Sequence, residues 1–459
     1  MSEIPSYDAL EFGVADGQQL VRWQEHFRLD DQRIAHGLGT RLGPRQSDLL
    51  DLAVAVYVTD RLRRRRPNRA RNDGRWWSRR LPVRLAVRDP SFWAGTEVRA
   101  LLHRLLAWLT DDDWEIEFES HPSSRRWAET QEPLFGGAVR APAQAGLFSG
   151  GLDSLLGAHR DAMCKEGELL LVAADTHNRL SHLQQQMARV LDELTPRPLR
   201  LLTVPVGLTS AARRLSNGKE EESQRSRGFL FLAFGIVVAD AAGLDQLRVY
   251  ENGVGALNLP LTSAQRGSMN TRAMRPETLA MMSRLASELL ERPFEIVNPN
   301  FWMTKAQMCA DAPAELHGLI ARSVSCDTGL THRADTTHLC GQCTSCLLRR
   351  QALLAAGRSD IDALDVQRMR GDVLACRQAE HAEPWLVCML AQAMTIKRAI
   401  DRGGWAALVD AYPELAGARR ALGCEPAQIL ALLERYVSDW RAVPSPLVSR
   451  FLAPAAGVT

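Results

Sequence analysis

The sequence predicts an α/β protein whose centre is a parallel, doubly wound sheet, with a smaller module on each side. Between residues 141 and 325, short apolar runs alternate with amphipathic stretches, which is the order of repeated strand and helix units. Runs such as Leu169 to Ala174 and Leu199 to Val206 are apolar on both faces, as expected of strands that helices cover on both sides. A glycine-rich loop follows the first run, and four clustered cysteines lie in the next segment, residues 326–357.

The flanking regions have different patterns. Residues 1–140 combine helix-like and alternating segments and predict an α+β module, whereas residues 358–459 predict a helical module with Gly and Pro at the breaks. No apolar stretch reaches the roughly 20 residues that span a membrane, and the start of the chain lacks the basic and apolar parts of a signal peptide. We therefore expect a cytoplasmic protein without a membrane partner. The sequence is compatible with a homodimer.

An arginine block, residues 61–80, holds ten arginines against the single acidic residue Asp73. Such a block can bind phosphates, including those of a nucleic acid. We favour a solvated loop over a nucleic-acid site, because the rest of the chain also uses arginine in place of lysine.

The glycine-rich loop, "SGGLDS" at residues 149–154, lies where the first strand of the sheet ends and the first helix begins. Glycines at such a junction let backbone N–H groups approach an anion, and the helix N-terminus favours negative charge. The loop lacks the lysine of a Walker P-loop, the G-x-G-x-x-G of a dinucleotide site and the flanking glycines of a serine-hydrolase elbow. The sequence therefore predicts a phosphate site of another kind.

The S-G-G-x-D-S spelling resembles the signature of the PP-loop ATP pyrophosphatases, which have the adenine nucleotide alpha hydrolase-like fold. The resemblance implies that the loop holds the part of ATP that leaves as pyrophosphate, while a substrate oxygen attacks the α-phosphate. The implied ATP-binding residues of the loop are Ser149, Gly150, Gly151, Leu152, Asp153 and Ser154.

Departure of pyrophosphate builds negative charge, which Mg²⁺ and fixed cations must stabilise. We expect Asp153 to help hold Mg²⁺, and Arg227 and Lys305 to supply the positive charges, with a surface salt bridge as the competing interpretation of each cation. Asp175 and His177 follow the second strand at its carboxyl end, where open α/β sheets bind ligands. We expect them near ATP, and a structural role for His177 stays open.

Four of the nine cysteines, Cys326, Cys340, Cys343 and Cys346, fall within one short segment. Four thiolates at this spacing suit a closed, structural Zn²⁺ site. An iron–sulfur cluster or a redox pair is the alternative. The other cysteines stand singly among apolar residues, and we expect them to be small core residues: Cys164, Cys309, Cys376, Cys388 and Cys424.

The segment "CDTGLTHRADTTHLCGQCTSCLLRRQALLAAG" resembles the zinc segment of 7-cyano-7-deazaguanine synthase, the QueC family, and "RSRGFLFLAFGIVVADAAG" and "MTKAQM" are similar to two other segments of that family. The resemblance covers residues 145 to 357. It implies an ATP-dependent ligase that activates the carboxylate of 7-carboxy-7-deazaguanine as an acyl adenylate. Ammonia then displaces AMP to form the amide, and a second ATP converts the amide to a nitrile.

The sequence departs from the family's pattern at two places, and the second falls on the residues expected to recognise the base. The family's asparagine after the helix arginine is Gly228 here, and its nucleobase loop is replaced by "ENGVGALNLPLTSAQR". In the new loop Glu251 could accept hydrogen bonds from a guanine-like edge, and Asn252 could pair with the carbonyl of that base. These two residues are the hypothesised substrate contacts.

The long flanking modules resemble those of QueC-like proteins of anti-phage operons, namely QatC of the Qat system and the QueC-like protein of type IV CBASS. This resemblance implies a role in defence, in which the acyl group passes to the N-terminus of a partner protein from the same operon instead of to ammonia. A different class of protein, a catalytically idle scaffold with zinc that binds nucleic acid or a defence partner, is the alternative. A third candidate, tRNA thiolation, would need a reactive cysteine outside the cluster.

Overall fold

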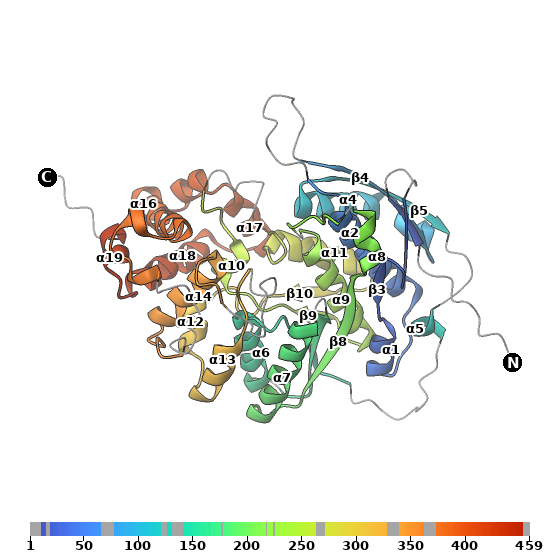
Figure 1. Cartoon of the computed structure of the whole chain (residues 1–459), viewed down its shortest axis with the longest axis horizontal. Helices are drawn as coiled ribbons and strands as arrows, with labels where there is room; N and C mark the ends of the chain where they lie inside the picture. The colour runs from blue at the N-terminus through green and yellow to red at the C-terminus, as the bar shows by residue number, and fades with distance from the viewer. Residues whose placement is uncertain are drawn as a thin grey trace.

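The computed structural model describes residues 11–14, 19–65, 78–120, 126–130, 141–164, 166–175, 178–216, 218–223, 225–262, 271–327, 339–361 and 373–452. Figure 1 shows the N-terminal elements at one end of the molecule, the C-terminal helices at the other and the central sheet between them.

A six-stranded sheet occupies the centre, with the strand order β10-β9-β6-β7-β8-β3. Its strands are β6 (Gln144–Leu147), β7 (Leu169–Asp175), β8 (Leu199–Leu208), β9 (Gln246–Arg248), β10 (Glu295–Val297) and β3 (Phe27–Leu29). The five strands from β6 to β10 pair in parallel, which confirms the predicted parallel sheet. The chain runs from β6 through β7 to β8 on one side and then crosses to β9 on the other side. The topological switch point therefore lies at β6, where open α/β sheets form their ligand crevice.

Strand β3 differs from the predicted arrangement, because it comes from the N-terminal region and pairs antiparallel with β8 at the edge of the central sheet. The remaining N-terminal strands form a separate sheet with the order β2-β1-β4-β5. The elements of this region are β1 (Glu11–Val14), β2 (Gln19–Arg22), α1 (Gln32–Leu38), α2 (Pro44–Leu62), β4 (Arg80–Val87), α3 (Pro90–Ala94), α4 (Thr96–Thr110), β5 (Asp113–Ser120) and α5 (Trp127–Thr130).

Helices cover both faces of the central sheet, and the residues of β7 show why the strand is apolar throughout. Leu170 and Val172 belong to one hydrophobic core, and Leu169 and Leu171 belong to another on the opposite face. Helices α9 (Arg227–Ala241), α11 (Pro276–Leu290) and the N-terminal α2 contribute to the first core. Helices α6 (Leu152–Cys164), α7 (Asn178–Leu194), α12 (Lys305–Ala310), α13 (His317–Arg322) and α14 (Thr344–Ala355) contribute to the second.

The C-terminal helices pack around a third core, which also includes residues of the central domain beside β9. These helices are α16 (Pro384–Ala411), α17 (Glu414–Leu422), α18 (Pro426–Arg441) and α19 (Pro446–Leu452). Short elements complete the fold: α8 (Ser210–Leu215), α10 (Gly253–Leu257) and the 3-10 turns η2 (Ala314–Leu316), η3 (Val373–Ala375) and η4 (Ala379–His381). Within the described ranges, no helix is long and apolar enough to cross a membrane.

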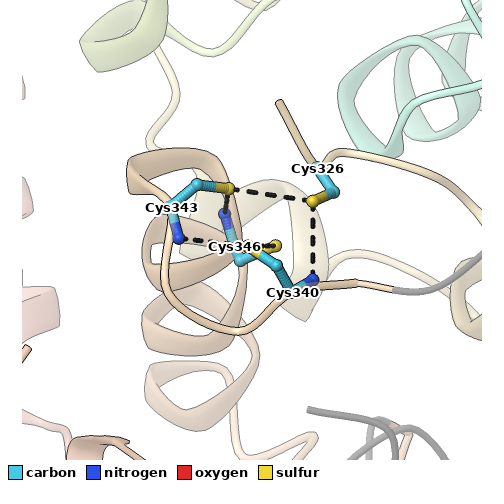
Figure 2. A group of neighbouring side chains, drawn as sticks. All are labelled: Cys326, Cys340, Cys343 and Cys346. Atoms are coloured by element: carbon cyan, nitrogen blue, oxygen red, sulfur yellow. Dashed lines mark hydrogen bonds between the residues drawn. The ribbon is translucent and has the colours of Figure 1, made fainter. Parts of the chain in front are cut away.

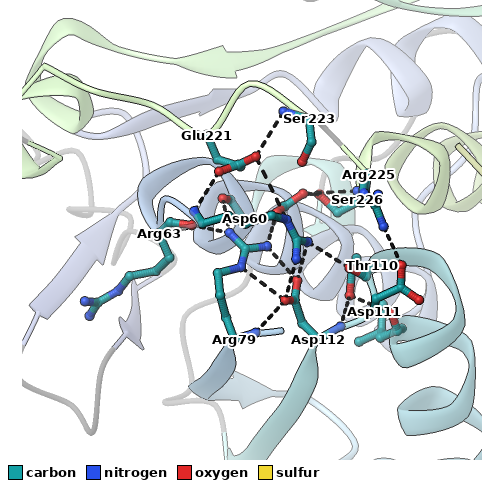
Figure 3. A network of polar contacts seen from close by, with 12 residues as sticks. Asp60, Arg63, Arg79, Thr110, Asp111, Asp112, Glu221, Ser223, Arg225 and Ser226 are labelled. Atoms are coloured by element: carbon teal, nitrogen blue, oxygen red, sulfur yellow. Dashed lines mark hydrogen bonds and ion pairs between the residues drawn. The ribbon is translucent and has the colours of Figure 1, made fainter. Parts of the chain in front are cut away.

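Part of the arginine block is buried in ion pairs of the N-terminal region that lie beside the central domain. Arg65 forms two hydrogen bonds to Asp112, of 2.8 and 2.6 Å, and Arg79 reaches both Asp112 and Asp60. The second oxygen of Asp60 accepts from the backbone and hydroxyl of Ser226, just before α9 (Figure 3). These arginines serve the fold, whereas residues 66–77 of the block lie outside the described residues.

Candidate functional site

The glycine-rich loop joins the end of β6 to the start of α6, at the switch point of the sheet. Gly150 has a φ of +77°, a left-handed conformation that favours glycine. The Ser149 hydroxyl accepts from the Gly151 amide at 3.2 Å and lies 3.1 Å from the Ser154 hydroxyl. The loop is braced by Gln184 of α7, whose amide donates to the backbone oxygen of Ser149. Backbone amides and two hydroxyls therefore gather at the start of α6, as a phosphate site requires.

Four predicted residues meet beside this loop. The Lys305 ammonium lies 2.6 Å from one oxygen of Asp153, and the Asn252 side-chain amide donates to the other oxygen at 2.9 Å. The same amide nitrogen of Asn252 lies 2.7 Å from a carboxylate oxygen of Glu251. Asp153 is the second residue of α6, Glu251 and Asn252 follow β9, and Lys305 is the first residue of α12. The residues reach one point because parallel strands present their carboxyl ends at the same edge of the sheet.

Burial and charge set the protonation of this cluster. Burial and then the neighbouring Asp153 carboxylate raise the pKa of Glu251 to about 8. Burial alone would lower the pKa of Lys305, but Asp153 and Glu251 outweigh it, so the pKa of the ammonium is raised. Near neutral pH the cluster therefore holds a firmly charged lysine, and Glu251 is largely protonated.

Asn298 and Thr304 hold the cluster in place, and neither was predicted from the sequence. Asn298 donates to the backbone oxygen of Glu251 at 2.8 Å and accepts from the amide of that residue at 3.3 Å. Thr304 caps the start of α12, and its hydroxyl accepts from the Gln307 amide. The polar "NPN" that follows β10 was the available signal, since residues at carboxyl ends of parallel strands face the ligand crevice.

Three other residues were predicted to bind ATP or to act in catalysis, and the structure describes two of them. Asp175 ends β7 at the same edge of the sheet, and its Oδ1 has no hydrogen-bond partner among the described residues. His177 lies outside the described residues. Arg227 begins α9, with its guanidinium 5.5 Å from the centre of the Phe231 ring and close enough to Tyr57 to affect the pKa of that hydroxyl. The roles of these three residues stay predictions.

The four clustered cysteines come together as predicted. All four sulfur atoms lie within 4.8 Å of one another, and Cys326–Cys343 and Cys340–Cys346 are 4.0 and 3.9 Å apart (Figure 2). A tetrahedral zinc ion with Zn–S bonds of about 2.3 Å would separate its sulfur ligands by about 3.8 Å, so the donor set fits zinc. Gly341, with a φ of +73°, makes the turn between the first two cysteines of the C-x-x-C-x-x-C run.

Three of the five single cysteines differ from expectation. Cys164 is exposed at the last position of α6, and Cys376 and Cys388 are half-buried, whereas Cys309 and Cys424 are buried as expected. Helix α6 has 13 residues, so its two ends are separated by about 20 Å. Cys164 therefore lies far from the glycine-rich loop at the opposite end of this helix.

The comparisons with known proteins match part of the chain. Residues 267–357 match the family model "Queuosine biosynthesis protein QueC", a stretch that contains Lys305 and the four cysteines. Over 139 residues the chain is 31% identical to the 7-cyano-7-deazaguanine synthase of Synechococcus sp. (strain CC9311), covering 29% of this chain and 54% of the relative. The match thus spans about half the length of that relative. The chain therefore carries a QueC-like segment within a larger mixed α/β protein.

Proposed function

We propose that this protein is an ATP-dependent, QueC-like ligase that adenylates the carboxylate of 7-carboxy-7-deazaguanine or a close analogue and releases pyrophosphate. The observation that carries the proposal is the convergence of the glycine-rich loop with Asp153, Lys305, Glu251 and Asn252 at the switch point of a parallel sheet. The QueC match supports it, because Lys305 and the cysteines fall inside the matched segment.

In this proposal the loop amides and the hydroxyls of Ser149 and Ser154 hold the phosphates that leave as pyrophosphate. The Lys305 ammonium offsets the negative charge that grows on them as the bond to the α-phosphorus breaks. Asp153 would hold Mg²⁺, which prefers oxygen ligands and would neutralise phosphate charge when bound. Zinc on the four cysteines would have no open position, so its contribution would be to fold the segment.

The acyl acceptor is an amine: ammonia, which leads to the amide and 7-cyano-7-deazaguanine, or the N-terminus of a partner protein in anti-phage defence. In this proposal the C-terminal helices border the acceptor site, because α18 packs beside α10 and the start of α12, next to Asn252 and Lys305. Arg435 of α18 donates to the backbone oxygen of Trp302 at 3.0 Å, and Gln392 of α16 donates to the backbone oxygen of Leu259 at 2.9 Å.

Pyrophosphate release on incubation with ATP, Mg²⁺ and 7-carboxy-7-deazaguanine tests the adenylation step. We expect release that depends on the deazaguanine and disappears in Asp153→Ala. No release, with or without protein partners from the same operon, would favour the idle scaffold instead. Mass spectrometry of the products then separates the acceptors, since a nitrile, an amide and a modified protein N-terminus differ in mass.

A further inference from the structure

A short segment before the cysteine cluster lies across the glycine-rich loop. The backbone amide of Val324 donates to the oxygen of Gly150 at 3.3 Å, and the amide of Leu152 donates to the Ser325 hydroxyl at 3.2 Å. The next residue is Cys326, the first cysteine of the cluster. The phosphate loop is therefore in direct contact with the residues that immediately precede the cysteine cluster.

The Leu152 amide is one of the first N–H groups of α6, and such groups have no partner inside their own helix. They are the groups that bind anions at helix N-termini. The Ser325 oxygen occupies this position in the present structure, beside Gly151. A serine hydroxyl both accepts and donates, so it can turn toward a phosphate oxygen that takes the amide.

The segment is anchored on both sides, by Arg349 of α14 and by Cys340 of the cysteine cluster. Arg349 is fully buried and donates to the hydroxyl of Ser323 at 2.6 Å and to the backbone oxygen of Ile320 at 2.6 Å. On the other side, the Cys326 sulfur accepts from the Cys340 amide at 3.4 Å. Ser325 lies between these anchors, so its hydroxyl is held in place before any ligand binds.

We propose that Ser325 is a third hydroxyl of the phosphate site and binds the β- and γ-phosphates of ATP, together with Ser149 and Ser154. This inference rests on the proposed function, because it names a further ligand of the same nucleotide. It also gives the cysteine cluster a function beyond folding: the cluster positions a residue that contacts the substrate.

Isothermal titration with two nucleotides tests the proposal. The first is α,β-methylene ATP, which cannot be cleaved to pyrophosphate, and the second is AMP, which lacks the β- and γ-phosphates. We expect Ser325→Ala to weaken binding of the triphosphate by tenfold or more, as the loss of a hydrogen bond to a charged group does. Binding of AMP should change by less than twofold. Ser325→Thr retains a hydroxyl and should restore most of the triphosphate affinity.

Ser345→Ala is the matched control. This serine lies between the last two cysteines of the cluster, and its hydroxyl donates to Asp327 at 2.7 Å instead of contacting the loop. It should bind both nucleotides as the unchanged protein does, and all variants should contain the same amount of zinc. Equal triphosphate affinity in Ser325→Ala and the unchanged protein would overturn the proposal and leave Ser325 as a helix cap that affects only thermal stability. If the unchanged protein fails to bind the triphosphate, the proposed function fails instead.

Discussion

Lys305 places a buried positive charge beside the Asp153 carboxylate, at the end of the loop that would hold the phosphates. We expect Lys305→Met to lower pyrophosphate release by about 100-fold or more, the usual loss when one fixed group that stabilises developing charge is removed. The initial rate of pyrophosphate release at saturating ATP measures this effect.

Lys397→Met is the matched control, because Lys397 forms an exposed pair with Asp401 on α16 and should leave the rate unchanged. Removal of Lys305 also leaves Asp153 buried without its ion pair, so circular dichroism must first show that the variant is folded. A folded Lys305→Met protein that retains a third of the rate would contradict the proposed role. Lys305→Arg then keeps the charge but loses the compact ammonium, and we expect an intermediate rate.

Glu251 makes stability depend on pH. Burial and the nearby Asp153 raise its pKa to about 8 in the folded protein, above the ordinary glutamate value of 4.5. A raised folded-state pKa means that the folded protein binds the proton more tightly, so this contribution to stability is complete below pH 4.5 and is lost as the pH rises toward 8. We expect Glu251→Gln to remove this dependence.

Urea denaturation at pH 5, 6.5 and 8 measures the effect. The free energy of unfolding of Glu251→Gln should fall less over this range than that of the unchanged protein. Glu295→Gln, at the exposed start of β10, is the control and should follow the unchanged protein. Parallel profiles for all three proteins would mean that Glu251 has the same pKa in the folded and unfolded protein, and would contradict the prediction.

Helix α10 shows how an element positions the cluster of Asp153, Glu251, Asn252 and Lys305. It begins at Gly253, next to Asn252, and the Gly253 amide donates to the oxygen of Met303 at 2.8 Å. A Cβ at Gly253 would overlap the backbone oxygen of Phe301 and press on Leu432 of α18.

We therefore expect Gly253→Ala to destabilise the protein by about 1–3 kcal/mol, as overpacking does, and to lower pyrophosphate release. Gly318→Ala is the control, because nothing lies within 4 Å of the added carbon and alanine favours the helix. It should be as stable as the unchanged protein or up to about 1 kcal/mol more stable. Thermal denaturation and the release assay compare the two variants, and equal behaviour would refute the argument.

Elements with a strong local signal could be predicted from the sequence, whereas those set by distant contacts could not. The strands around Leu171 are apolar on both faces, and the SGG loop has a spelling that only a few sites share. Strand β3 has three residues, and its pairing with β8 depends on residues nearly 180 positions away in the chain. Ser325 carries no signal of its own, because only the folded chain brings it to Leu152.

At the scale of the whole molecule, the N-terminal region and the central sheet share one hydrophobic core. Helix α2 is buried along most of its length and packs against α9, so neither helix has a face left for solvent. A boundary near residue 140 describes the order of elements along the chain but not the core. We expect the two regions to unfold together, because separating them would expose the apolar surfaces of both helices.

Asp60 tests this coupling, because its fully buried carboxylate joins Arg79 of the N-terminal region to Ser226 before α9. Asp60→Ala should destabilise the protein by about 3–5 kcal/mol, because the buried Arg79 then loses one of its two carboxylate partners and keeps only Asp112. The exposed pair of Glu117 with Arg84 provides the control, and Glu117→Ala should change stability by less than about 1 kcal/mol. Urea denaturation followed by both tryptophan fluorescence and circular dichroism should give a single transition for both variants. Two separate transitions, or a loss below about 1 kcal/mol in Asp60→Ala, would show that the N-terminal region folds independently of the sheet.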